Sequence, residues 1–365
     1  MNSIKEENDG VDFMGLQFKP DLEDASKHWE AYFSGDIIKR PLVCVTAPKP
    51  GMPHDYVWYK DVCYQDSDIV IDRFHDIMMN TYWGGDAIPH TYLTLGPDEI
   101  AASCGSELLF TEGMESNTNW SRPIIKDPDD YLKISLDKES LTWKRIIELY
   151  EKAAVKFKDK AIVSMPDLHS NMDILMALRG TENLCFDLID IPEIIDEAML
   201  RAHAVFIELW EILRQKGNME QSGYCQLAYS PEGAAVLQCD FSCMMSVDMF
   251  DRWVLPALEE EAAIAKHVVY HWDGPQAKTH ENSLVNSELI QTLQYVPGAG
   301  QGSHLDNVDF LRHLQDRGKN VQVWASPDEA RELHKTLVPD KTLYVVTAAT
   351  PDEADALIEW FEKNT

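Results

Sequence analysis

Apolar runs and amphipathic segments alternate along most of the chain. The runs are short, and several are nearly continuous in apolar residues, as expected of strands covered on both faces. They predict strands over 41–47, 161–167, 234–240, 267–273, 293–298, 321–326 and 343–348. Apolar residues at helical spacing predict helices over 21–36, 141–157, 192–217, 247–267 and 305–319.

Two of the late helices share one start signal. "SPDE" (326–329) and "TPDE" (350–353) each place Ser or Thr at the N-cap, then Pro, then Glu at the third helical position. This pattern is a capping box, and both copies follow directly on a predicted strand. Repeated strand–helix units require a parallel sheet, and about eight of them close a barrel. An open doubly wound sheet is the alternative, but "TAPKPGMP" after the first strand lacks a GxGxxG turn.

Composition narrows the partners and the compartment. The chain has 365 residues, 45% of them apolar, and a net charge of -30. It is therefore expected to be globular, and its acidity argues against nucleic acid and anionic membranes as partners. No stretch is long enough to span a membrane, and the seven cysteines include no CxxC pair. We expect a cytoplasmic protein with an N-terminal arm (1–24) and one large domain (25–365).

His271 and Asp273 end an apolar run, and Gly274-Pro275 follows at once. Residues i and i+2 of a strand share a face, so both side chains are expected to point the same way from the carboxyl end of a buried strand. The pair predicts a catalytic site and is a candidate ligand pair for zinc or another divalent cation. Two simpler interpretations stay open: His271 can be a core histidine, and Asp273 can shape the turn.

Polar residues at the ends of other strands complete the expected site. Asp240 ends the run 234–240, where a buried carboxylate is costly unless it is paired or takes part in chemistry, and we assign it to catalysis. The expected substrate-binding residues are Asp167, His169, Asn171, Trp83, Asp86, Gln294 and His304. For Asn171, capping of the next helix is an alternative, and for Trp83 packing is.

Four stretches carry a resemblance to a known superfamily. They are "DLHSNMDILMALRGTENLCFDLIDIPE" (167–193), "DFSCMMSVDMFDRWVLPALEEE" (240–261), "YHWDG" (270–274) and "LYVVTAATPDEADALIEWFEK" (343–363). They resemble conserved blocks of the uroporphyrinogen decarboxylase superfamily, whose other large branch is the corrinoid-dependent methyltransferases. The resemblance covers most of the chain. It implies an α/β fold, a single (β/α)8 TIM barrel with N-terminal helical additions, and a site at the carboxyl ends of the strands.

The sequence departs from both branches at the residues that carry their chemistry. The decarboxylases have two arginines after the first strand, whereas 45–53 holds Lys49 as its only cation, and Thr94 stands near the place of their catalytic aspartate. This loss excludes uroporphyrinogen as substrate. The methyltransferases bind zinc through His-x-Cys and a later cysteine. Here Asp273 replaces the first cysteine and no cysteine follows Cys243, so a zinc–thiolate site cannot form.

We expect a methyltransferase or demethylase that takes a methyl group from a small methoxylated or methylated compound and passes it to a corrinoid carried by a partner protein. His271 and Asp273 would bind a divalent metal or act as acid and orienter, together with Asp240. Two alternatives stay open. One is a metal-independent decarboxylase or lyase of the same superfamily, and the other is a ligand-binding barrel without catalysis.

Overall fold

The computed structural model describes residues 15–52, 55–110, 118–298 and 300–365. The strands in these ranges are β1 (Leu42–Pro48), β2 (Thr81–Gly85), β3 (Leu108–Leu109), β4 (Trp120–Ser121), β5 (Tyr224–Cys225), β6 (Tyr229–Ser230), β7 (Ala234–Gln238), β8 (His267–Asp273), β9 (Thr292–Val296), β10 (Asn320–Ala325) and β11 (Thr342–Thr347). The helices are α1 (Leu22–Phe33), α2 (Tyr59–Tyr64), α3 (Ser67–Asn80), α4 (Glu99–Ser103), α5 (Leu141–Lys156), α6 (Asn171–Arg179), α7 (Thr181–Asp190), α8 (Pro192–Lys216), α9 (Met219–Ser222), α10 (Val247–Met249), α11 (Leu255–Ala262), α12 (Glu281–Asn286), α13 (Val308–Asp316), α14 (Pro327–Leu333) and α15 (Pro351–Asn364).

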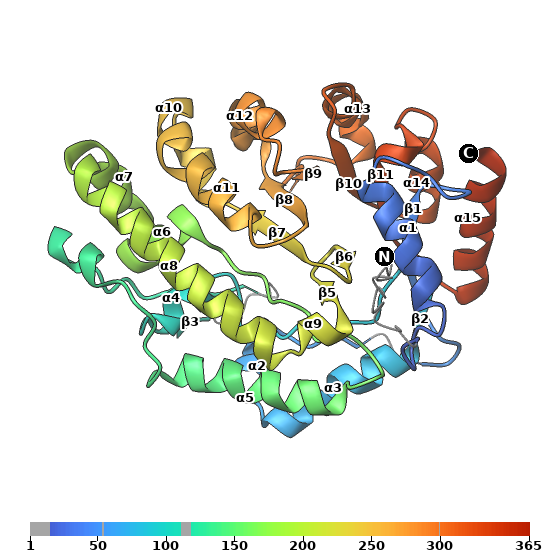
Figure 1. Cartoon of the computed structure of the whole chain (residues 1–365), viewed down its shortest axis with the longest axis horizontal. Helices are drawn as coiled ribbons and strands as arrows, with labels where there is room; N and C mark the ends of the chain where they lie inside the picture. The colour runs from blue at the N-terminus through green and yellow to red at the C-terminus, as the bar shows by residue number, and fades with distance from the viewer. Residues whose placement is uncertain (1–14, 53–54, 111–117, 299) are drawn as a thin grey trace, which may run out of the picture.

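The main sheet has the strand order β2-β1-β11-β10-β9-β8-β7. Neighbours from β1 to β7 pair parallel, and β2 pairs antiparallel with β1 at one edge. The fold is therefore mixed α/β with a mainly parallel sheet. Figure 1 shows helices on the outside of this sheet, with α3, α5 and α8 on one side of the molecule and α13, α14 and α15 on the other. Since the strands are parallel, their carboxyl ends lie along one edge.

Six of the seven predicted strands are confirmed, and the segment 161–167 is the exception. Its pairing is a single parallel bridge between Ile162 and His90. Thr91 N donates to the Ile162 carbonyl, and Ile162 N donates to the Pro89 carbonyl, at 2.9 and 3.0 Å. Pro166 has no N–H to donate, so a regular ladder cannot continue toward Asp167.

The helix predicted over 247–267 is interrupted. It consists of α10, a π-helical turn at Phe250–Val254, and α11. Pro256 gives the physical reason, because it lacks the N–H that would bond to the Arg252 carbonyl and its ring crowds that carbonyl. A widened turn places this carbonyl away from the ring.

One of the two predicted capping boxes is complete. Ser326 Oγ accepts from Glu329 N, and the Glu329 carboxylate accepts from Ser326 N. At α15, Thr350 Oγ1 accepts from Glu353 N as predicted, but the Glu353 carboxylate accepts from Ala349 N at 2.7 Å, one residue before the N-cap. Both helices thus start where the sequence predicts.

The two faces of the parallel strands pack in different places. On β8, Val269 packs with residues of other strands such as Val236 and Leu343. Trp272, on the opposite face, packs against Phe310 of α13, with ring centroids 5.7 Å apart. The alternation expected of β8 is therefore present, and His271 and Asp273 share the face of Val269.

Helix α1, near the N-terminus, packs against the sheet. The Tyr32 hydroxyl donates to the Val321 carbonyl, and Leu22, Ala25 and Trp29 are buried. The domain boundary expected between residues 24 and 25 falls inside this helix, and residues 1–14 lie outside the described ranges. Within the described part of the chain, no helix combines the length and apolar character needed to cross a membrane.

Candidate active site at the carboxyl ends of the strands

A histidine surrounded by carboxylates lies beyond the ends of β7 and of the segment 161–167. Ring nitrogens of His169 lie 3.5 Å from Asp173, 3.7 Å from Asp167 and 3.8 Å from Asp240. We call these four residues the His169 cluster. The Asp240 and Asp167 side chains are 39% and 27% exposed, whereas that of Asp173 is 1% exposed. A ligand can therefore reach Asp240 and Asp167, while Asp173 acts from the interior.

Hydrogen bonds fix the carboxylates in place. Asp173 lies in the first turn of α6, and its two oxygens accept from Asp240 N and Phe241 N at 2.9 and 2.8 Å. Asp167 accepts from Gln238 Nε2 at 2.7 Å. These hydrogen bonds fix the position of the chain after β7 relative to the start of α6.

The charges of the cluster shift the pKa values of its members. Burial alone would lower the pKa of His169, but Asp167, Asp173 and Asp240 together raise it well above its ordinary value. Burial raises the pKa of Asp240 to about 6, and Asp173 adds to the rise while His169 opposes it. Burial also disfavours the ionised form of Asp167, yet His169, His271 and Gln238 lower its pKa. At neutral pH the cluster therefore holds a protonated histidine next to ionised aspartates.

His271 and Asp273 lie at the end of β8 as predicted. His271 is half-buried and its Nδ1 lies 2.5 Å from Gln294 Oε1, while Asp273 is exposed. Both affect the pKa of Asp240, His271 lowering it and Asp273 raising it. The structure thus brings together Asp167, His169, Asp240, His271, Asp273 and Gln294 from the residues that the sequence singled out.

Two fully buried carboxyl groups lie behind the cluster. Glu99 accepts from Leu95 N and Thr94 Oγ1, and Glu261 accepts from Ser170 Oγ. Burial raises the pKa of each to about 8. Both are therefore mostly protonated at neutral pH, and they add no full negative charge to the site.

Three of the expected substrate-binding residues make hydrogen bonds to backbone carbonyls of the protein. Asn171 is fully buried in the first turn of α6 and donates to the Gln238 carbonyl at 3.0 Å. The N-cap of this helix is Ser170, without a side-chain capping hydrogen bond, so capping by Asn171 is not confirmed. Trp83 Nε1 donates to the Met78 carbonyl. His304 is buried and its Nε2 contacts the Tyr295 carbonyl at 3.0 Å.

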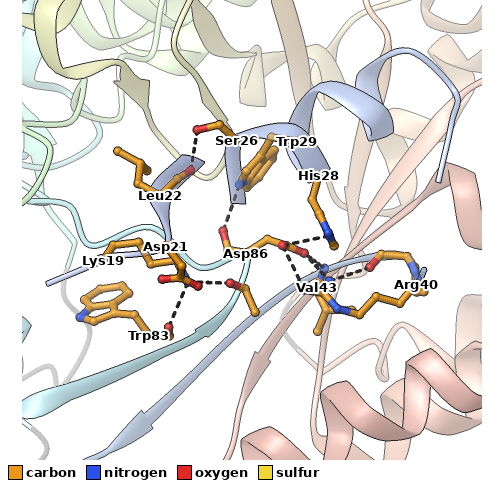
Figure 2. A network of polar contacts seen from close by, with 12 residues as sticks. Lys19, Asp21, Leu22, Ser26, His28, Trp29, Arg40, Val43, Trp83 and Asp86 are labelled. Atoms are coloured by element: carbon orange, nitrogen blue, oxygen red, sulfur yellow. Dashed lines mark hydrogen bonds and ion pairs between the residues drawn. The ribbon is translucent and has the colours of Figure 1, made fainter. Parts of the chain in front are cut away.

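Asp86 lies at the amino end of β1, opposite to the cluster. It accepts from Val43 N at 2.9 Å and from Arg40, and His28 lies 3.2 Å away (Figure 2). Burial raises its pKa, but the hydrogen bonds from His28 and Arg40 lower it below the ordinary value. This buried carboxylate is fully paired, so it does not join the candidate site.

The residues present do not match a zinc site. Among residues 15–52, 55–110, 118–298 and 300–365, no three His, Cys, Asp or Glu side chains are grouped so that they could hold a metal ion. His271 and Asp273 are thus two candidate ligands where zinc sites use three or four protein ligands.

Sequence reasoning missed Asp173 and Gln238. Asp173 is four residues after His169, a helical spacing across a loop–helix junction that no strand pattern marks. Gln238 shares its strand face with Val236, two residues before it, and an inward polar residue in an apolar run was the available signal. Both position the predicted residues.

A solved structure of a methyltransferase from Methanosarcina mazei is similar in fold. The match has a TM-score of 0.61 and 11% sequence identity, and it covers 93% of this chain and 98% of that chain. No protein-family model and no curated protein matches the sequence. At this identity the likeness shows a shared fold over nearly the whole of both chains.

Proposed function

We propose that this protein is an enzyme that transfers a methyl group from a small methoxylated or methylated compound to a corrinoid carried by a separate protein. The likeness in fold to a methyltransferase over 93% of the chain is the observation that carries this proposal. The His169 cluster supports it, because it places a proton donor at the carboxyl ends of the strands, where such folds hold their substrates.

We propose further that the main sheet closes into a (β/α)8 barrel of the uroporphyrinogen decarboxylase type. Segments 88–93 and 161–166 would be its second and third strands. Two contacts support the closure. Ile162 and His90 form a parallel bridge, and Gln238 of β7 bonds to Asp167.

The cluster suits the protonation of a leaving oxygen. When the methyl carbon of a methoxy group is transferred, the carbon–oxygen bond breaks and its electron pair stays on oxygen, which then needs a proton. His169 holds a proton in reach of Asp240, whose pKa of about 6 allows it to relay that proton near neutral pH. The corrinoid, when bound, supplies the nucleophile that accepts the methyl group. His271, Asp273 and Gln294 would bind and orient the substrate.

The charge of the site argues against a carboxylated substrate. The groups that shift the pKa of Asp240 most are His169, Asp173, His271 and Asp273. Lys49, the cation that follows β1, is exposed and donates to the Met79 carbonyl. Decarboxylation is the second candidate, since the same acid could protonate a carbanion. It ranks below methyl transfer because the substrate carboxylate would lie next to three aspartates. A ligand-binding barrel without catalysis is the third.

The test is an assay for demethylation. The purified protein is incubated with chemically reduced free corrinoid and with panels of methoxylated and N-methylated compounds, and methylated corrinoid and demethylated product are quantified. The expected result is transfer that His169→Gln reduces at least about 100-fold, as expected on removal of a general acid. Asp36→Asn, which removes an exposed carboxylate before the amino end of β1, is the matched control and should leave the rate unchanged. Release of CO2 without methyl transfer would contradict the proposal.

A further inference from the structure

The candidate site has an excess of negative charge that the protein does not neutralise. Asp167, Asp173 and Asp240 share one protonated histidine, and Asp273 adds a fourth carboxylate within electrostatic range of Asp240. Holding like charges together is costly unless a cation is bound among them. Asp240 Oδ1 is buried and has no hydrogen-bond partner among the described residues.

A second, independent feature is an unpaired donor next to the cluster. The Gln294 side chain is fully buried, and its Oε1 contacts His271 Nδ1 at 2.5 Å. Its Nε2 has no hydrogen-bond partner in the described part of the chain. Native proteins rarely leave a buried amide donor unpaired, so this donor points to an acceptor atom that a ligand brings. The acceptor would lie beside His271, which itself lies within electrostatic range of Asp167 and Asp240.

Aromatic rings lie on the Asp167 side of the cluster. Tyr59 and Tyr92 share a hydrogen bond, and the pKa of each is raised first by burial and further by the charge of Asp167. Trp58, the residue before Tyr59, is 45% exposed, and its ring lies 5.0 Å from that of Tyr56. Carboxylates next to aromatic rings are the surroundings in which proteins bind ammonium and quaternary ammonium groups.

We propose that the site binds a small organic cation, in which Asp167, Asp240 and Asp273 hold an ammonium group while Gln294 Nε2 donates to an oxygen of the same molecule. The proposal deepens the function given above and rests on it in one respect: the methyl group that is transferred would be carried by that oxygen. The substrate class is then a small methoxylated amine, and the product is the corresponding amino alcohol.

A pair of ligands of equal shape separates charge from shape. Choline carries a quaternary ammonium group and a hydroxyl oxygen, and 3,3-dimethylbutan-1-ol replaces the charged nitrogen with carbon. Isothermal titration calorimetry of the full-length protein with each should show choline bound at least about tenfold more tightly, because one charge meets several carboxylates in a half-buried site. Added salt should narrow the difference.

Variants locate the binding. Asp240→Asn should weaken choline binding about tenfold or more and leave the alcohol unaffected. Asp273→Asn, at an exposed position, should act in the same direction and serves if the first variant is unstable. Gln294→Leu should weaken both ligands, since both have the oxygen. The control Asp36→Asn should change neither.

The outcomes distinguish this inference from the proposed function. Equal affinity for the two ligands, or no binding of choline at millimolar concentration, would overturn the cation site. Tighter binding of choline that Asp240→Asn abolishes would support it, even if choline methyl ether and reduced corrinoid gave no methylated corrinoid. The absence of methylated corrinoid would contradict the proposed methyl transfer but not the cation site. Demethylation of neutral methoxy compounds by a protein that has no affinity for choline would support methyl transfer and contradict the cation site.

Discussion

Replacing Asp173 with Asn should lower the free energy of unfolding by about 2–4 kcal/mol, because its carboxylate accepts two backbone hydrogen bonds in the interior. The acceptors are Oδ2 for Asp240 N at 2.9 Å and Oδ1 for Phe241 N at 2.8 Å, and the side chain is 1% exposed. An Asn can accept with one oxygen, and its NH2 group then faces the other N–H. Each hydrogen bond to a charged group contributes about 1.5–3 kcal/mol, and a buried donor left unpaired costs about 1–3 kcal/mol.

Asp240→Asn is the matched control for this change. Its side chain is 39% exposed, one of its oxygens has no partner among the described residues, and burial raises its pKa to about 6. The ionised form is therefore disfavoured in the folded protein at pH 7, so a neutral isostere should leave the free energy of unfolding unchanged or raise it. Both variants remove a carboxylate from one cluster, so a loss of stability confined to Asp173→Asn reports its backbone hydrogen bonds.

Guanidinium titration followed by far-UV circular dichroism measures both variants at pH 7. Demethylation is measured alongside. Asp173→Asn should lose stability and part of the turnover, because the backbone of Asp240 is no longer held, whereas Asp240→Asn should lose turnover alone. If Asp173→Asn unfolds at the same denaturant concentration as Asp240→Asn, the positioning role assigned to Asp173 is wrong.

Three further outcomes follow from the same contacts. Glu99 has a pKa of about 8 in the folded protein, above its unfolded value, so its contribution to stability is lost as the pH rises from about 4.5 to 8, and Glu99→Gln should flatten this fall in a pH series of unfolding titrations. An unchanged slope would show that Glu99 is ionised. His271→Ala should abolish demethylation while lowering the free energy of unfolding by about 1–2 kcal/mol, since the half-buried ring gives up one hydrogen bond to Gln294. Metal analysis of chelator-free protein should find no stoichiometric divalent ion, and activity that EDTA removes and zinc restores would refute this expectation.

Most of the sheet could be predicted because buried parallel strands have a simple signature. The runs at 267–273 and 343–348 consist mostly of apolar and β-branched residues, and the structure has β8 and β11 there. The segment 161–167 is also largely apolar but forms a single bridge, at Ile162, and Pro166 has no N–H with which to continue a ladder. The composition of a segment indicates whether its side chains suit a strand, whereas strand pairing also requires backbone N–H groups that can donate to a neighbouring strand.

The site could be predicted in part because polar residues at strand ends are visible in the sequence. Asp240 and His271 were found in this way. Asp173 was not found, since its role depends on a long-range contact between the first turn of α6 and the backbone that follows β7. No local sequence pattern indicates this contact. Asp86 was expected to bind substrate, but it pairs with Arg40, which lies 46 residues earlier in the chain. Long-range pairing of this kind is decided by the fold.

Carboxylates are paired completely at the amino ends of the parallel strands and incompletely at their carboxyl ends, where the candidate site lies. At the amino end of β1, Asp86 is matched by Arg40 and His28 (Figure 2). Lys19 donates to the carbonyl of the preceding residue, Gly85. At the carboxyl ends, three aspartates share His169, and Asp240 keeps a raised pKa. A carboxylate that is fully paired stabilises the folded state. Carboxylates that are incompletely paired lower the stability of the folded state, but they can exchange protons with a substrate and attract its charge. A variant that supplied the missing positive charge, such as Asp273→Lys, should therefore gain stability and lose activity together.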